Sequence, residues 1–165
     1  MERRVVQDED RPAIAEFIAR HWHSRKVMSG GRAYYPHEER GFIEWREGRI
    51  AGLLTFTVQG DSMEMLTLNA IPSGHGIGTA MTLMAIDFAR ENNLRRIWLT
   101  TTNDNLRAIG FYQRLGFRMT QIHIGAVDKA RLIKPEIPEV GEGGIPIHDE
   151  VVLELTLRPP THAAS

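Results

Sequence analysis

Apolar residues recur three and four positions apart in three stretches of the chain, which is the spacing of one face of a helix. The predicted helices cover residues 12–23, 76–91 and 106–115. Pro12 suits the first turn of the first helix, and the acidic residues just before it are capping candidates. The second helix carries so wide an apolar stripe that we expect it to press against a sheet.

Apolar and polar residues alternate in much of the remaining chain, and this period of two predicts strands. The predicted strands are residues 5–6, a hairpin over 41–58 that turns at Glu47-Gly48, and residues 63–69, 96–101, 117–124 and 150–157. The strands up to residue 69 form an antiparallel meander, and the strand–helix–strand run that follows implies a parallel crossover. We therefore predict an α/β fold with a mixed (α+β) sheet, in which an antiparallel N-terminal meander adjoins a parallel strand pair and helices lie on both faces.

Two segments lack either period. Ser24–Tyr35 contains two adjacent glycines and is predicted to be a mobile loop. Gly125–Asp149 is rich in proline and glycine and is predicted to be a long loop between two strands. We expect both segments to shape a pocket near the cleft, and the second is long enough to cover a partner copy in a homodimer.

Composition narrows the class of protein. The 165 residues suit one domain, which we place at residues 1–158 with a flexible tail at 159–165. The net charge of −1 gives no overall field that would attract nucleic acid or a membrane. The absence of cysteine excludes disulfides and thiolate chemistry, and no apolar run approaches the roughly 18 residues of a membrane span. We predict a cytoplasmic protein without a metal site, since His21 and His23 point different ways on a helix.

The glycine-rich segment Ser73–Thr79 lies between a predicted strand and the second predicted helix. Free main-chain N–H groups and the helix dipole favour an anion at such a helix start, and glycine lets phosphate oxygens approach. A Walker loop is excluded because no lysine follows Gly78. A dinucleotide fingerprint is excluded because Thr79 and Met81 stand where its third glycine is required. The segment therefore predicts a phosphate site of another kind, with a purely structural turn as the alternative.

At these residues the chain resembles the GCN5-related N-acetyltransferases (GNAT). Their first signature, Gln/Arg-x-x-Gly-x-Gly/Ala at the start of the long helix, is matched by Gly76 and Gly78, although Ser73 stands at the Gln/Arg position. The second signature, Asn-x-x-Ala-x-x-x-Tyr-x-x-x-Gly-Phe, is more specific and is matched by residues 105–117. The resemblance covers roughly residues 5–124. It implies a GNAT-like fold and transfer of an acetyl group from acetyl-CoA to a primary amine.

The resemblance also implies roles for individual residues. The pantetheine arm would contact Leu66, Thr67 and Leu68. The pyrophosphate would contact Gly74, His75, Gly76, Ile77, Gly78 and Thr79. Asn105 would bond the cofactor through its side-chain amide, and Tyr112 would face the sulfur as the general acid. The backbone N–H near Leu68 is the candidate donor to the oxyanion of the tetrahedral intermediate.

A base is the missing part of this mechanism, because an amine of pKa about 10 is mostly protonated at neutral pH. In some relatives a glutamate on the strand before the Asn helix removes the proton, and Thr100 stands at that position here. Glu64 is the best remaining carboxylate. The open alternatives are His75, Glu38, His123 and a chain of water molecules.

The acceptor is left open between small-molecule and peptide amines. Tyr34, Tyr35 and His37 end the first irregular segment and are candidates for contact with it, with surface packing as the alternative. Two other functions also remain open: a module that binds acyl-CoA without transferring the acyl group, and a nucleotide-binding regulatory domain. Release of CoA thiol in the presence of amines would distinguish the enzyme from either of them.

Overall fold

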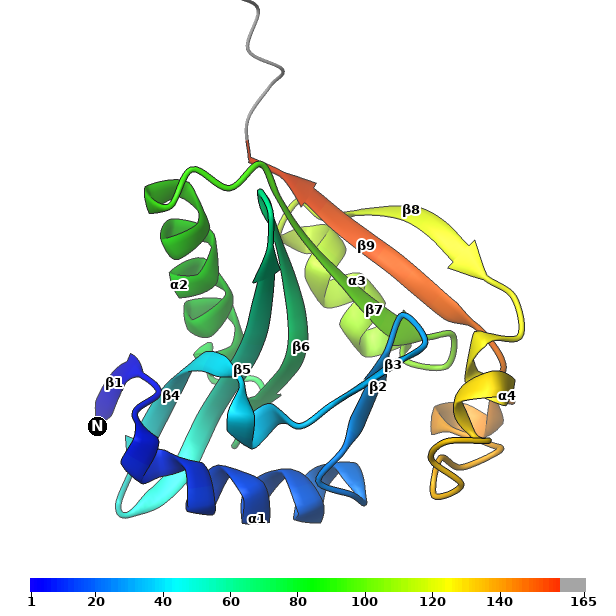
Figure 1. Cartoon of the computed structure of the whole chain (residues 1–165), viewed down its shortest axis with the longest axis horizontal. Coiled ribbons are helices and arrows are strands. Elements are labelled where there is room, and N and C mark those ends of the chain that lie inside the picture. The colour runs from blue at the N-terminus through cyan, green and yellow to red at the C-terminus, as the bar shows by residue number, and fades with distance from the viewer. Residues whose placement is uncertain (158–165) are drawn as a thin grey trace, which may run out of the picture.

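The computed structural model describes residues 1–157. Its strands form a seven-stranded sheet in the order β1-β4-β5-β6-β7-β9-β8 and a separate hairpin of β2 and β3 (Figure 1). The strands are β1 (Glu2–Val5), β2 (Val27–Ser29), β3 (Arg32–Tyr34), β4 (Arg40–Arg46), β5 (Arg49–Gln59), β6 (Ser62–Ala70), β7 (Arg96–Thr102), β8 (Arg118–His123) and β9 (Glu150–Thr156). The α-helices are α1 (Arg11–Trp22), α2 (Ile77–Glu91), α3 (Leu106–Arg114) and α4 (Ala126–Ala130), and short 3-10 helices cover Asp8–Asp10, Pro36–Glu38 and Glu142–Gly144.

The sheet is mixed, as predicted. β6 and β7 run parallel and are connected through α2, whereas the other pairings of the described sheet are antiparallel. Helices cover both of its faces. Ile14 of α1 packs with Leu53 on one face, and Met81 of α2 and Tyr112 of α3 pack with Leu54 on the other. The neighbours Leu53 and Leu54 enter different cores because side chains alternate along a strand.

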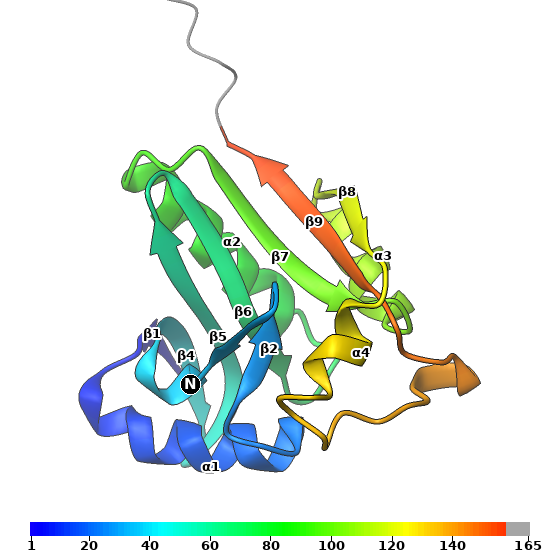
Figure 2. The ribbon, with the colours of Figure 1, turned by 45° about the vertical axis from the view of Figure 1, so that its right-hand side comes forward.

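β6 and β7 separate halfway along their length, which opens the middle of the sheet (Figure 2). Their last paired residues are Met65 and Leu99. Leu66 then forms a bulge, because Met65 and Thr67 pair with consecutive residues of β5. A bulge bends its strand and strengthens the local twist. Beyond it, β6 keeps β5 as a neighbour but has lost β7, so a strand edge lies open inside the sheet.

The prediction of a loop at residues 24–35 is wrong, since β2 and β3 form a hairpin there whose two turn glycines have φ of 57° and 78°. The hairpin spans the gap between β6 and β7 (Figure 1). Ser29 holds it in place through hydrogen bonds to Glu64 of β6 and Thr100 of β7. Strands of three residues are too short to show a period, so tertiary contacts rather than local pattern order this segment.

The prediction of a long loop at residues 125–149 is also wrong in part, because the segment contains α4 and the 3-10 helix at Glu142–Gly144. Arg131 organises this segment from within. Its guanidinium donates to the main-chain carbonyls of Ile137 at 3.2 Å and of Pro138 and Ile147 at 2.6 Å each. One side chain that bonds several distant carbonyls leaves no periodic pattern in a sequence.

The predicted domain boundary at residue 158 stays a prediction, and the predicted tail at residues 159–165 lies outside the described residues. Within residues 1–157, no helix has the length and apolar character needed to cross a bilayer.

Candidate active site

A groove of about 800 Å³ follows the open half of β6 and passes between the glycine-rich turn and α3. We call it the β6–α3 groove. Its lining residues are Leu68, Ala70, Ser73, Gly74, Gly76, Gly78, Thr79, Asn105, Arg107, Ala108, Phe111, Tyr112 and Arg114. Strand, turn and helix converge here because the bulge at Leu66 has separated β6 from β7.

The glycine-rich turn ends in a helix start that has free main-chain donors. Gly74 and Gly76 have φ of 80° and 78°, in the left-handed region that glycine enters without a steric penalty. Ala80 donates a main-chain hydrogen bond to the carbonyl of Gly76 at 3.0 Å, and no side chain caps this helix start. The amides of the three residues before Ala80 are those that helix geometry leaves without an intrahelical partner. Together with the dipole of α2, they form a site for an anion.

The groove contains one nearly buried phenol, that of Tyr112. Its ring is only 7% exposed and makes edge contacts with Phe111 and Phe117, at centroid distances of 5.0 and 5.3 Å. Burial raises the pKa of the phenol above its ordinary value of 10.0. Tyr112 therefore stays protonated at neutral pH and can act as a hydrogen-bond donor.

Asn105 connects the groove to a second cavity, because it lines both. Its Oδ1 accepts a hydrogen bond from the amide of Ala108 at 3.2 Å and so caps α3. An amide side chain also carries two donor hydrogens on nitrogen. The capping bond thus fixes the side chain while Nδ2 remains available to a ligand.

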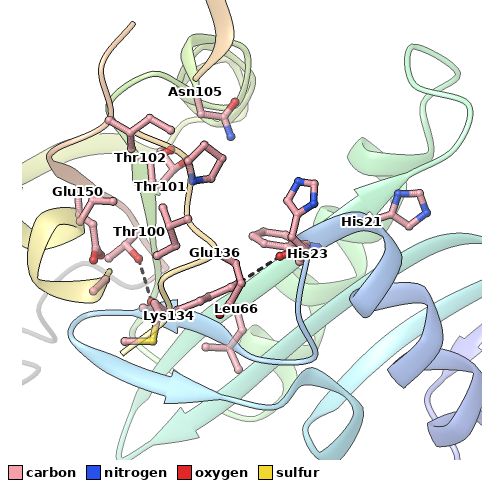
Figure 3. Close-up of a pocket in the computed structure, with 18 residues that line it drawn as sticks. His21, His23, Leu66, Thr100, Thr101, Thr102, Asn105, Lys134, Glu136 and Glu150 are labelled. Atoms are coloured by element: carbon pink, nitrogen blue, oxygen red, sulfur yellow. Dashed lines mark hydrogen bonds between the residues drawn. The ribbon is translucent and has the colours of Figure 1, made fainter. Parts of the chain in front are cut away.

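The second cavity has a volume of about 250 Å³ and is lined by Leu66 of β6 and Thr100 of β7, next to the opening between these strands (Figure 3). We call it the β7–α4 cavity. Its walls come from the end of α1, from β2, from the bulge of β6, from the end of β7 and from the segment that begins at α4. Two hydroxyl residues of its wall, Ser29 and Thr100, are joined by a hydrogen bond of 2.8 Å (Figure 3).

Glu64 is the carboxylate next to these hydroxyls, and it does not itself line the cavity. Its carboxylate accepts hydrogen bonds from Ser29 Oγ at 2.6 Å and from the hydroxyl of Tyr34 at 3.2 Å. Burial raises the pKa of Glu64, the two hydrogen bonds oppose that rise, and the charge of Glu150 adds to it. Since the one hydroxyl hydrogen of Ser29 goes to Glu64, Thr100 must donate the bond between the two hydroxyls. The lone pairs of Thr100 Oγ1 are then free to accept from a molecule in the cavity.

Comparison with known proteins agrees with this geometry. The model of the acetyltransferase (GNAT) family matches residues 6–117. The chain is 39% identical over 140 residues to the uncharacterized protein YdhI of Bacillus subtilis (strain 168), a match that spans 84% of this chain and 88% of YdhI. The chain belongs to the GNAT family of acetyltransferases. The resemblance drawn from the two motifs is thereby confirmed.

Solved structures of GNAT proteins share the fold at low sequence identity. IAA acetyltransferase from Bacillus cereus ATCC 14579 has a TM-score of 0.70 at 18% identity, over 94% of this chain and 99% of that chain. The structure of yncA from Salmonella typhimurium, solved with its cofactor acetyl-CoA, has a TM-score of 0.67 at 19% identity, over 100% of this chain and 97% of that chain. The predicted GNAT-like fold is confirmed.

The structure brings most of the predicted cofactor residues to the β6–α3 groove, namely Leu68, Gly74, Gly76, Gly78, Thr79, Asn105 and Tyr112. Four others lie elsewhere. Leu66 lines the β7–α4 cavity, and the hydroxyl of Thr67 shares a buried hydrogen bond of 2.6 Å with Thr55. His75 is exposed, with its ring on the carbonyl of Ser73, and the side chain of Ile77 is buried in the core.

The predicted acceptor residues separate into two groups. Tyr34 reaches Glu64 through its hydroxyl, so it lies next to the candidate base. Tyr35 is exposed and contacts His37 edge to face at 6.2 Å, and neither side chain lines the groove or the β7–α4 cavity. The roles of all three as acceptor contacts remain predictions.

Sequence reasoning missed two buried charged residues of the β7–α4 cavity, besides the exposed Glu136. Glu150 is the first residue of β9 and pairs with Thr102 of β7, and Lys134 follows α4. Both are buried. Glu150 begins a strand whose alternation was recognised, but alternation alone does not show that this carboxylate faces a cavity. The segment that holds Lys134 was predicted to be a loop, and a loop has no period that would indicate which side chains face a cavity.

Proposed function

We propose that the protein transfers the acetyl group of acetyl-CoA to a primary amine. The observation that carries this proposal is the arrangement of two connected sites around Asn105. On one side of this residue lies a groove with free helix-start amides and a buried phenol, and on the other lies a cavity with a carboxylate relay. A donor in the groove and an acceptor in the cavity would meet beside Asn105.

Acetyl-CoA is the donor. Its pyrophosphate binds the amides at the start of α2, where the dipole favours negative charge. The pantetheine arm runs along the open edge of β6, which offers main-chain hydrogen bonds as a neighbouring strand would. The solved relative with bound acetyl-CoA supports this choice. Arg107 and Arg114 also line the groove and can pair with phosphate charge, while Ser73 stands where the family signature has Gln or Arg.

The reaction replaces a C–S bond by a C–N bond. The amine nitrogen attacks the thioester carbonyl carbon, and the backbone N–H of Leu68 receives the oxyanion of the intermediate. The C–S bond then breaks and Tyr112 donates a proton to the thiolate. An ammonium acceptor loses two protons in all. In the overall reaction, one of them corresponds to the proton that the CoA sulfur gains, and the other is released to solvent.

Glu64 is the proposed base, and it acts through Thr100 and Ser29. The ammonium gives a proton to Thr100 Oγ1, the hydrogen of Thr100 passes to Ser29, and that of Ser29 passes to Glu64. The two bonds of 2.8 and 2.6 Å are within the range for O–H donors. A raised pKa suits Glu64 to this task because a base works best when its pKa approaches the working pH.

The test is an assay of CoA release. The protein is mixed with acetyl-CoA and a panel of small amines, and free thiol is followed over time, with the N-acetyl product identified by mass spectrometry. We expect thiol release that depends on both the protein and the amine. If calorimetry shows that acetyl-CoA binds but no amine in a broad panel releases thiol, the protein is a binding module and the proposal is wrong.

A further inference from the structure

The β7–α4 cavity has two nearly buried residues of opposite charge on its walls. Glu150 and Lys134 are each only 5% exposed, and both line the cavity (Figure 3). Within residues 1–157, neither forms an ion pair, although the exposed carboxylate Glu136 lines the same cavity. A buried charge without a partner is unfavourable, because the interior does not replace the water that it loses. A bound molecule that carries a positive and a negative group could supply the missing partner to each residue.

Lys134 has a neutral partner. Its Nζ donates to the main-chain carbonyl of Trp22 at 3.1 Å, which uses one of the three ammonium hydrogens (Figure 3). Burial lowers the pKa of Lys134, the negative charge of Glu136 raises it, and the positive charge of Lys26 lowers it. Two ammonium donors thus remain for an anionic group in the cavity.

Glu150 has only a weak partner. Its Oε2 accepts the amide hydrogen of Gly30 at an N···O distance of 3.3 Å, beyond the usual range. A carboxylate can accept about four hydrogen bonds, so most of its capacity is unused. Glu150 pairs with Thr102 across β7 and β9, and Thr100 lies on the same face two residues earlier. An ammonium on Glu150 would lie on the wall that carries the proposed proton relay.

The rest of the cavity limits the size and character of its ligand. Many of its other walls are apolar, formed by Met28, Leu66, Val127, Ala130, Ile137 and Ile147. Its volume of about 250 Å³ is below the roughly 300–1,000 Å³ of pockets for drug-sized molecules. The cavity therefore suits a small molecule with an apolar body and two opposite charges.

We propose that the acceptor is a free amino acid with an apolar side chain, whose ammonium pairs with Glu150 and whose carboxylate pairs with Lys134. This inference rests on the proposed acetyl transfer. It excludes a simple alkylamine and the N-terminus of a protein as preferred acceptors, because neither brings a carboxylate to Lys134.

The first experiment compares acceptors that differ only in the carboxylate. Leucine, leucinamide and 3-methylbutylamine are assayed with wild-type protein and acetyl-CoA, and so are valine, valinamide and 2-methylpropylamine. We expect kcat/KM to be at least tenfold higher for the amino acid than for either partner in at least one series. Equal or better use of the amides and alkylamines in both series would overturn the inference.

The second experiment tests whether Lys134 is responsible. Lys134→Met should bring the ratio of kcat/KM for amino acid over alkylamine close to one, and Lys134→Arg should restore much of the ratio. Lys129→Met, which changes a lysine outside this cavity, should leave the ratio unchanged. If Lys134 serves only to hold its segment to Trp22, Lys134→Met lowers both substrates together, the ratio stays the same, and the inference fails.

The two proposals fail in different ways. Transfer to carboxylate-free amines without preference for amino acids overturns this inference and leaves acetyl transfer intact. No thiol release with any amine overturns acetyl transfer itself. The acceptor series uses only the wild-type protein, so its result does not depend on the folding of a variant.

Discussion

Replacement of Glu64 by glutamine tests the proposed proton relay most directly. Ser29 and Tyr34 donate to different oxygens of Glu64. Glutamine has nearly the same shape, and its amide oxygen can accept from Ser29 while its amide nitrogen donates to the hydroxyl oxygen of Tyr34, so the β2–β3 hairpin should stay in place. It cannot take up a proton from Ser29. The variant therefore separates the chemistry of this position from its packing.

The expected loss of turnover follows from the role of a general base. Such a group contributes about 10²- to 10⁴-fold, which corresponds to about 2.7 to 5.4 kcal/mol of transition-state stabilisation. We expect kcat of Glu64→Gln to fall by this factor in the CoA-release assay, with the affinity for acetyl-CoA unchanged in calorimetry. In the wild type, kcat should fall at low pH as Glu64 becomes protonated, with an apparent pKa above 4.5, and this decline should be absent from the variant.

Stability should change in the opposite direction to activity. A carboxyl group whose pKa is raised in the folded state supports folding below its unfolded pKa, and this support is lost as the pH rises through the folded pKa. Burial raises the pKa of Glu64 from its ordinary value of 4.5, so the wild type loses this contribution as the pH rises above 4.5. The glutamine variant does not titrate at this position. The melting temperature of Glu64→Gln relative to wild type should therefore increase between about pH 4 and pH 8.

Glu44→Gln is the matched control. Glu44 is a buried carboxylate of β4 that is bonded to Arg3 and lies far along the sheet from the cavity. Its replacement should lower stability and leave kcat near the wild-type value. If Glu64→Gln keeps more than a tenth of wild-type turnover with a good acceptor, Glu64 is not the base and the relay is refuted.

Three further outcomes are expected. Tyr112→Phe should lower kcat about 10²-fold at unchanged acetyl-CoA affinity, and near-normal turnover would remove the phenol from the mechanism. Gly78→Val should weaken acetyl-CoA binding at least tenfold in calorimetry, because its Cβ would project beside Phe111 in the groove, and unchanged affinity would place the pyrophosphate elsewhere. Ile14→Ala should lower the free energy of unfolding by about 2 to 5 kcal/mol in urea titrations, since this fully buried side chain fills the core under α1, and a loss below about 1 kcal/mol would contradict that packing.

Local chemistry made the cofactor groove predictable. Gly76 and Gly78 have a backbone role that depends on their lack of a side chain, and Asn105 caps a helix that carries Tyr112 two turns later. Each of these features acts over a few neighbouring residues, so it leaves a fixed spacing in the chain. The order of strands and helices was predictable for the same reason, because each period is a local property.

The acceptor side was decided by the tertiary structure. Ser29, Thr100 and Glu64 come from a hairpin and two strands, and their hydrogen bonds span 35 and 71 residues of chain. Glu150 and Lys134 meet in one cavity only because β9 pairs with β7 and the segment after α4 folds back onto the end of α1. No spacing along the chain encodes such contacts. The sequence by itself thus determined the family, the fold class and the candidate phosphate turn, whereas long-range packing decided which charges face the acceptor.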